Sequence, residues 1–178
     1  MTVLSAATTR LLAARVAREQ SQRRLPSLVA GVFRSGELAW TGGAGLVHGA
    51  VPDADVQYRC GSITKTFAAV LVMALRDDGE LDLEDPLERH LPGTPVGSAT
   101  IGALLAHASG LRAETAGPWW ERTAGGTYAE LVASSLGADA RLTRPGRRFH
   151  YSNVGYALLG EVVARLRGAP WDQVLRAE

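Results

Sequence analysis

Residues 61–79 read GSITKTFAAVLVMALRDDG, and Ser62 stands three positions before Lys65. The apolar run at residues 67–75 predicts a helix, with Ser62 as its N-cap and Gly79 as its stop. Apolar side chains fall on nearly all sides of this helix, so we expect it to be central and buried. Residues three apart share one face of a helix, so Ser62 and Lys65 are expected to be neighbours near its first turn.

One hairpin and several helices are predicted around this central helix. An amphipathic helix is expected at residues 3–24, a β-hairpin at 28–33 and 38–41, and further helices at 100–108, 127–136 and 153–166. The pattern predicts an α+β fold in a single partial domain, residues 1–178, with an antiparallel sheet flanked by helices. In this domain residues 1–65 hold the N-terminal helix, the hairpin and the approach to Ser62, and residues 66–178 are mainly helical. A two-stranded hairpin is marginal by itself, so we expect the missing strands to lie beyond Glu178.

Composition and charge limit the classes of function. The 178 residues are 46% hydrophobic and 21% charged, a balance typical of one globular domain. The 19 basic and 18 acidic residues leave a net charge of +1, so we expect no nucleic-acid partner. A single cysteine, Cys60, excludes an internal disulfide and a multi-cysteine zinc site, and we expect it to be a small buried filler. The four histidines are dispersed along the chain, so no metal site is predicted.

Neither a membrane span nor a secretory leader is predicted. The longest apolar run, residues 67–75, is far shorter than the roughly 20 residues that a transmembrane helix needs. Three arginines, Arg10, Arg15 and Arg18, interrupt the stretch where the apolar core of a leader would lie. We therefore expect a cytoplasmic protein, and the alternative is an exported form whose leader has been removed.

Lys65 and Asn153 are each the single residue of their type in the chain, although 18 arginines are present. A serine hydroxyl is a poor nucleophile unless a base removes its proton. Lysine can act as that base when desolvation disfavours its ammonium form, whereas arginine stays protonated. Ser62 and Lys65 therefore form a candidate nucleophile and base. The plainer alternative is that Ser62 only caps the helix and Lys65 is a solvated first-turn residue.

The single asparagine follows a tyrosine by two positions, in Tyr151-Ser152-Asn153. A tyrosine hydroxyl near the serine and lysine can pass a proton to a leaving group. An asparagine amide can hold Lys65 in place and contact a substrate carbonyl. Because the two sparse motifs coincide in one chain, a shared catalytic site is favoured over coincidence.

Three stretches of the chain resemble one known family. They are RCGSITKTF at residues 59–67, IGALLAHASGL at 101–111 and PGRRFHYSNVGY at 145–156. The Ser-x-x-Lys motif occurs in penicillin-binding proteins and β-lactamases. With Tyr-x-Asn as the second motif, the chain is similar to class C β-lactamases and D-alanyl-D-alanine carboxypeptidases, in the β-lactamase family of serine hydrolases. The resemblance implies a β-lactamase/transpeptidase-like fold.

The resemblance also implies roles for the four residues. Ser62 is the acylated nucleophile, Lys65 and Tyr151 share the general-base and general-acid work, and Asn153 positions the substrate and the lysine. The backbone N–H of Ser62 supplies half of an oxyanion hole. No metal or organic cofactor is required. The substrate is a small molecule or peptide with an amide or ester bond: a β-lactam, a D-amino-acid peptide or a small ester.

The chain departs from the family in one respect. Members carry a third motif, Lys- or His-Thr/Ser-Gly, on a late strand that also supplies the second oxyanion N–H, and no such motif follows Asn153. We therefore expect the N-terminal portion of a longer enzyme, completed by a further C-terminal segment. Two alternatives stay open: a catalytically silent binding module, and an inactive truncated fragment.

Other residues are given non-catalytic interpretations. His107 is expected to be a structural, hydrogen-bonded histidine. His150 adjoins Tyr151 on an extended segment, so it should point to the other face. Trp119 and Trp120 lie in a loop that either lines the pocket or forms a satellite hydrophobic cluster.

Overall fold

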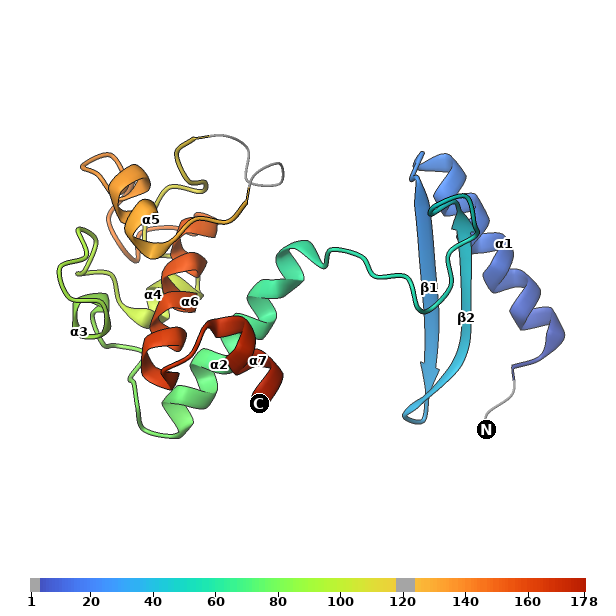
Figure 1. The fold of residues 1–178 in the computed structure, drawn as a ribbon, viewed down its shortest axis with the longest axis horizontal. Helices are drawn as coiled ribbons and strands as arrows, with labels where there is room; N and C mark the ends of the chain where they lie inside the picture. Colours follow the sequence, from blue (N-terminus) through green and yellow to red (C-terminus); the bar gives the residue numbers. More distant parts are fainter. Residues whose placement is uncertain (1–3, 118–123) are drawn as a thin grey trace. The chain divides into compact units, whose positions relative to one another are not determined.

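The computed structural model describes residues 4–117 and 124–178. Its contacts divide the chain into two compact units, Met1–Arg59 and Cys60–Glu178, called here the N-terminal unit and the helical unit (Figure 1). This boundary lies six residues before the predicted division at residue 65. The assignment of the whole chain to a single partial domain stays a prediction.

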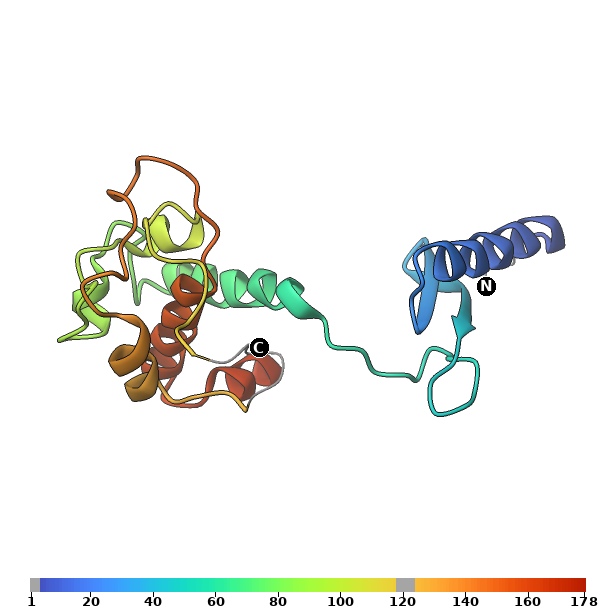
Figure 2. The ribbon, with the colours of Figure 1, turned by 90° about the horizontal axis from the view of Figure 1, so that it is seen from above.

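The N-terminal unit consists of a helix and a hairpin. Helix α1 (Ala6–Gln22) begins at Ser5, whose hydroxyl accepts from the Thr8 N–H, and the strands are β1 (Ser27–Arg34) and β2 (Glu37–Gly45). The strands pair antiparallel, and α1 lies alongside them in both views (Figures 1 and 2). The predicted helix and hairpin are therefore confirmed, and β2 extends beyond its predicted end at residue 41, through glycines that lie close to the chain that follows. At Gly43, a Cβ would lie 1.9 Å from a backbone oxygen of that chain.

The helical unit contains the remaining elements. In chain order they are the 3-10 turn η1 (Gly61–Ile63) and helices α2 (Thr64–Asp77), α3 (Leu87–His90), α4 (Ile101–Leu105), α5 (Tyr128–Ser135), α6 (Asn153–Arg167) and α7 (Trp171–Ala177). Helix α6 crosses the middle of the unit and contacts α2, α3, α4, α5 and α7 (Figure 1). Its fully buried side chains include Val154, Leu158, Leu159 and Val162. The core therefore lies where α6 meets α2, α3 and α4.

Several predicted helix ends are confirmed by their capping contacts. The Thr100 hydroxyl accepts from the Ala103 N–H at the start of α4. Thr127 and Glu130 form a reciprocal capping box at α5. Helix α6 stops at Gly168, which adopts the left-handed conformation that favours glycine (φ 68°). Helix α4 is shorter than predicted, because the chain turns after Ala106 toward Ser109-Gly110.

Three local expectations are wrong. Helix α2 buries a single face, formed by Ala68, Leu71, Val72 and Leu75 at helical spacing, whereas Phe67 and Val70 on its other sides are 42% and 60% exposed. Ser62 is not the N-cap of α2, because the 3-10 turn comes first and the cap position falls on Ile63. Cys60 is exposed rather than buried, with its sulfur 3.1 Å from the Thr64 hydroxyl.

Candidate active site

The 3-10 turn before α2 presents Ser62 to solvent. Gly61, the first residue of this turn, has a positive φ of 55°, a conformation that glycine adopts readily. Lys65 follows in the first turn of α2 and is half-buried, and its Nζ lies 3.5 Å from the Ser62 Oγ. The predicted proximity of serine and lysine is therefore present, although one of the two residues lies in a 3-10 turn.

Tyr151 reaches the same serine from a segment 89 residues away along the chain. Its hydroxyl donates to the Ser62 Oγ at 2.7 Å. The Lys65 Nζ lies 4.7 Å from the centre of the Tyr151 ring, a cation–π distance. Burial raises the pKa of Tyr151, but hydrogen bonds with Lys65 and Ser62 and the lysine charge outweigh burial, so the pKa of this phenol is lowered overall.

Asn153 is the first residue of α6 and links the lysine to an acidic residue. Its Oδ1 accepts a short hydrogen bond from the Lys65 Nζ, and its Nδ2 donates to the Glu114 Oε1 at 2.8 Å. The backbone N–H of Asn153 is held by the Ala113 carbonyl at 2.7 Å. The structure thus brings Ser62, Lys65, Tyr151 and Asn153 into one hydrogen-bonded cluster.

Glu114 belongs to this cluster and was missed by the sequence analysis. One of its carboxylate oxygens accepts from Asn153, while the other, Oε2, is buried without a hydrogen-bond partner. Because a carboxylate only accepts hydrogen bonds, Glu114 obliges Asn153 to turn its Nδ2 toward it and its Oδ1 toward Lys65. No spacing pattern in the sequence marks Glu114, since its contact with Asn153 joins residues 39 positions apart.

His107 packs directly behind the tyrosine. Its Nδ1 accepts from the Ser152 N–H at 3.0 Å, which confirms the expected hydrogen-bonded histidine. Its ring centre lies 4.5 Å from that of Tyr151 and 4.9 Å from that of Tyr156. Burial, followed by the charge of Lys65, lowers the pKa of His107. His150 makes a backbone hydrogen bond to the same residue.

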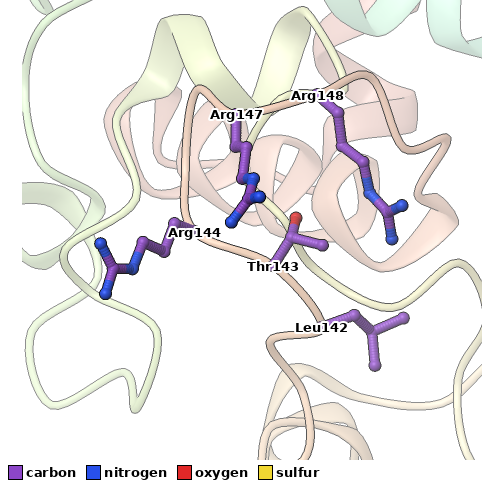
Figure 3. A pocket seen from close by; sticks show the side chains of 5 residues that line it. All are labelled: Leu142, Thr143, Arg144, Arg147 and Arg148. Atoms are coloured by element: carbon purple, nitrogen blue, oxygen red, sulfur yellow. The ribbon is translucent and has the colours of Figure 1, made fainter.

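A groove and a smaller hollow lie among the described residues of the helical unit. A groove of about 1440 Å³ extends from Lys65 past Tyr156 to Trp171 and is lined by residues of α2, α5, α6 and α7. A smaller hollow of about 370 Å³, lined by Leu142, Thr143, Arg144, Arg147 and Arg148, contains none of the predicted site residues. Its three guanidinium groups point in different directions, so they do not converge on one point (Figure 3).

Two further expectations bear on the site. Among residues 4–117 and 124–178, no group of three or more His, Cys, Asp or Glu side chains is placed to hold a metal ion. Trp119 and Trp120, the predicted pocket-lining residues, lie outside the described residues.

The structure has a β-lactamase/transpeptidase-like fold. Its N-terminal unit contains the antiparallel hairpin, and its helical unit carries the serine, lysine and tyrosine in mutual contact. The chain belongs to the Beta-lactamase family, whose family model matches residues 9–178. The resemblance predicted from the sequence is therefore confirmed.

Curated relatives and solved structures agree with this family. The chain is 33% identical to "Penicillin-binding protein 4" of Amycolatopsis lactamdurans, over 88% of this chain and 42% of the relative, and 33% identical to "Esterase EstB" of Burkholderia gladioli, over 84% and 43%. The D-amino acid amidase of Ochrobactrum anthropi SV3 with bound D-phenylalanine is a structural neighbour with a TM-score of 0.81 and 25% identity, over 95% of this chain and 48% of the amidase. The D-alanine carboxypeptidase AmpC of Burkholderia cenocepacia has a TM-score of 0.75 and 25% identity, over 98% and 48%.

The chain spans less than half of the length of these relatives. Their names are those of a penicillin-binding protein, an esterase, a D-amino acid amidase and a D-alanine carboxypeptidase. In the part of the chain that the structure describes, no helix is both long and apolar enough to cross a membrane.

Proposed function

We propose that this chain carries the nucleophile of a serine hydrolase that acts on an amide or ester bond through an acyl-enzyme. One observation carries the proposal: the Tyr151 hydroxyl lies 2.7 Å from the Ser62 Oγ, with the Lys65 Nζ 3.5 Å from the same oxygen. A nucleophile needs a base within hydrogen-bond reach, and two such groups converge on Ser62. Glu114, Asn153 and Lys65 form the chain of hydrogen bonds behind it.

In the acylation step, the Ser62 Oγ attacks the carbonyl carbon of the substrate and its proton passes to Tyr151 or Lys65. The tetrahedral intermediate places negative charge on the carbonyl oxygen, toward which the Ser62 N–H is the proposed donor. The bond to the leaving group then breaks, and the leaving nitrogen or oxygen receives the proton from the same pair. A water molecule reverses the sequence: it loses a proton to the pair, its oxygen bonds to the acyl carbon, and the Ser62 Oγ leaves and regains a proton.

The lowered pKa of Tyr151 supports its place in this relay. A phenol accepts the serine proton only as a phenolate, and the Lys65 contacts that lower its pKa increase that population at a given pH. Lys65 donates to Asn153 and lies over the tyrosine ring, so its charge stabilises the phenolate directly.

The names of the relatives support the proposed range of substrates. Among them are a penicillin-binding protein, an esterase and a D-amino acid amidase, whose names cover β-lactam, ester and amide bonds. We propose that the apolar part of such a substrate occupies the groove beside Lys65, because ligand sites are concave and largely apolar. A C-terminal segment that supplies the second oxyanion N–H is part of the proposal, as is a cytoplasmic location.

Covalent labelling tests the proposal directly. The chain is incubated with a fluorescent fluorophosphonate, a fluorescent penicillin and p-nitrophenyl acetate, and adducts are located by intact-mass and peptide mass spectrometry. We expect one adduct on Ser62, lost in Ser62→Ala. Ser98→Ala is the matched control, since Ser98 is also exposed in the helical unit, lies outside the groove and accepts a hydrogen bond from Arg141.

A catalytically silent binding module is the competing outcome. It is favoured if a sample that unfolds cooperatively takes up no label from any of the three reagents yet binds them reversibly in equilibrium dialysis. Labelling that persists in Ser62→Ala contradicts the assignment of the nucleophile.

A further inference from the structure

One residue, His107, holds the backbone on both sides of Tyr151. Its carbonyl oxygen accepts from the His150 N–H at 2.7 Å, and its imidazole Nδ1 accepts from the Ser152 N–H at 3.0 Å. These two N–H groups belong to the residues directly before and after Tyr151. Two hydrogen bonds from a single residue therefore fix the path of the chain from which the tyrosine side chain projects.

The backbone of His107 is bent to make this double contact. Its φ is +54°, in the left-handed region that side chains other than glycine rarely adopt. Non-glycine residues persist in this region when the surrounding structure imposes it, and such residues gather at functional sites. In this conformation, the carbonyl and the ring of His107 both accept hydrogen bonds from the segment 150–152.

The imidazole ring also supports the two tyrosine rings that face Lys65. It lies 4.5 Å from the centre of Tyr151 and 4.9 Å from that of Tyr156, with interplanar angles of 31° and 35°. The Lys65 Nζ lies 4.7 Å and 5.6 Å from the same two rings. The histidine is thus packed against the rings that line the lysine.

The hydrogen bond to Ser152 sets the protonation state that this arrangement needs. A peptide N–H is only a donor, so the Nδ1 of His107 must carry a lone pair and the ring proton of the neutral form lies on Nε2. A doubly protonated imidazolium has no lone pair and cannot accept this bond. Protonation of His107 therefore removes one of the two contacts beside Tyr151.

We propose that His107 is a positioning residue that holds Tyr151 against the Ser62 hydroxyl, and that it does so only as a neutral imidazole. The inference rests on the proposed roles of Ser62 and Tyr151 in acyl transfer. It adds His107, which does not take part in the bond changes, to the site. It also predicts a pH limit, because protonation of His107 at low pH breaks its hydrogen bond to the Ser152 N–H beside Tyr151.

Charged and titratable neighbours set the direction of this pH limit. Lys65 faces the ring from α2, Tyr151 from the segment before α6, and Tyr156 from α6 itself; Glu114 acts on Tyr151. Burial and the Lys65 charge lower the pKa of His107, so the neutral ring persists below the pH of about 6.5 at which an ordinary histidine titrates. The loss of support is expected on the acid side of that pH.

Three variants separate positioning from general damage. His107→Asn keeps a side-chain acceptor and a residue that tolerates the left-handed region, but it has no group that titrates near neutral pH. His107→Leu keeps bulk and loses the acceptor. His48→Leu is the matched control, because His48 is exposed and also has a positive φ, of 50°, in the N-terminal unit.

The measurement is the rate of Ser62 labelling by a fluorophosphonate from pH 4.5 to 9, with thermal unfolding recorded for each variant. We expect His107→Leu to label about 10²-fold more slowly than wild type at pH 7.5. We expect His107→Asn to recover most of the rate and to lose the decline on the acid side, with His48→Leu equal to wild type. A folded His107→Leu that labels at the wild-type rate, or a His107→Asn that keeps the same acid decline, overturns the proposal.

A second readout does not depend on labelling. With ¹³C-Cζ tyrosine in the full chain, the Tyr151 signal is assigned by its loss in Tyr151→Phe and followed with pH. We expect this signal to report the His107 titration in wild type and no such step in His107→Asn. An absent step in wild type contradicts the inference, whereas its presence in a chain that takes no label shows that the proposed function alone has failed.

Discussion

Ser62, Lys65 and Tyr151 meet because two consecutive turns of the chain are followed by one long-range hydrogen bond. The 3-10 turn and the first turn of α2 place the serine and lysine together, and the tyrosine arrives from a segment held by His107. The Asn153 Oδ1 accepts a hydrogen bond from Lys65, and Glu114 accepts one from the Asn153 Nδ2. At this scale the chemistry depends on single atoms, so single-atom substitutions test it.

Tyr151→Phe removes the hydroxyl and keeps the ring that packs on His107. We expect Ser62 labelling to slow by about 10²–10⁴-fold, the usual contribution of a general acid or base, with thermal unfolding nearly unchanged. In wild type the rate should rise with pH as the phenolate forms. Because the pKa of Tyr151 is lowered, this rise should begin below the pH at which free tyrosine ionises. A wild-type pH profile retained in Tyr151→Phe would contradict the assignment.

Glu114→Gln removes a carboxylate and keeps its shape. Glutamine offers both a donor and an acceptor, so Asn153 is free to turn its Oδ1 away from Lys65. A hydrogen bond to a charged group is worth about 1.5–3 kcal/mol, so we expect the labelling rate to fall by about 10-fold or more. Thermal unfolding should change little, because glutamine keeps the shape of the side chain and its carbonyl oxygen can still accept from the Asn153 Nδ2. A labelling rate equal to wild type would remove Glu114 from the site.

At the scale of elements, the loop before Tyr151 is built on the turn after α4. The carbonyl of Gly110 accepts from the N–H groups of Leu142 and Thr143, and the Gly146 N–H donates to the Ala108 carbonyl. The His107 contacts continue the same pairing as far as Ser152. The position of the tyrosine therefore depends on how closely these two segments approach.

Gly110→Ala tests that close approach. Gly110 has a φ of +75°, and a Cβ there would lie 2.1 Å from the Thr143 carbonyl oxygen. Backbone strain alone costs about 1–3 kcal/mol, and the clash adds a displacement of the loop. We expect a lower unfolding temperature and slower Ser62 labelling.

Gly146→Ala is the control for this prediction, because Gly146 has a φ of +74° and open space around the added Cβ. It should show the strain without the displacement, so labelling of the folded protein should stay at the wild-type rate. Equal effects of the two substitutions on labelling would mean that the close approach at Gly110 does not position Tyr151.

At the scale of the whole molecule, the core and the candidate site lie in the same unit. Among the described residues, the core cluster runs from Leu71 to Val174, and the residues of the hydrogen-bonded cluster all lie after residue 60. In the described part of the N-terminal unit, Val16 is the buried hydrophobic side chain of α1, whereas Leu11, Phe33 and Leu46 are exposed. The two units therefore differ in how much apolar surface each buries.

Residues 60–178 expressed alone should keep the helical unit folded. We expect a cooperative thermal transition by circular dichroism, since the core cluster is retained in full. Residues 1–59 expressed alone should show no cooperative transition, because a helix and a two-stranded hairpin bury little apolar surface. A noncooperative melt of residues 60–178 would mean that the helical unit depends on the N-terminal residues.

The sequence alone was enough to predict the features that depend on residues close together along the chain. The helix starts predicted at residues 100 and 127, the helix end predicted near residue 166 and the hairpin rest on local signals, and the structure agrees with them. The spacing of Ser62 and Lys65 is likewise a property of three consecutive peptide units. The sparse motifs at 62–65 and 151–153 predicted which residues would meet, and resemblance to the β-lactamase family gave them roles.

Tertiary structure alone decided the contacts between distant segments. Glu114 beside Asn153, His107 around Tyr151 and the exposure of Cys60 and Phe67 follow from how loops and helices pack, and no period or spacing encodes them. Side-chain periodicity shows that α2 has apolar residues on several faces, but which face is buried depends on where α6 lies. Local rules act over three or four residues, whereas the site is closed by hydrogen bonds that span 39 to 89 residues.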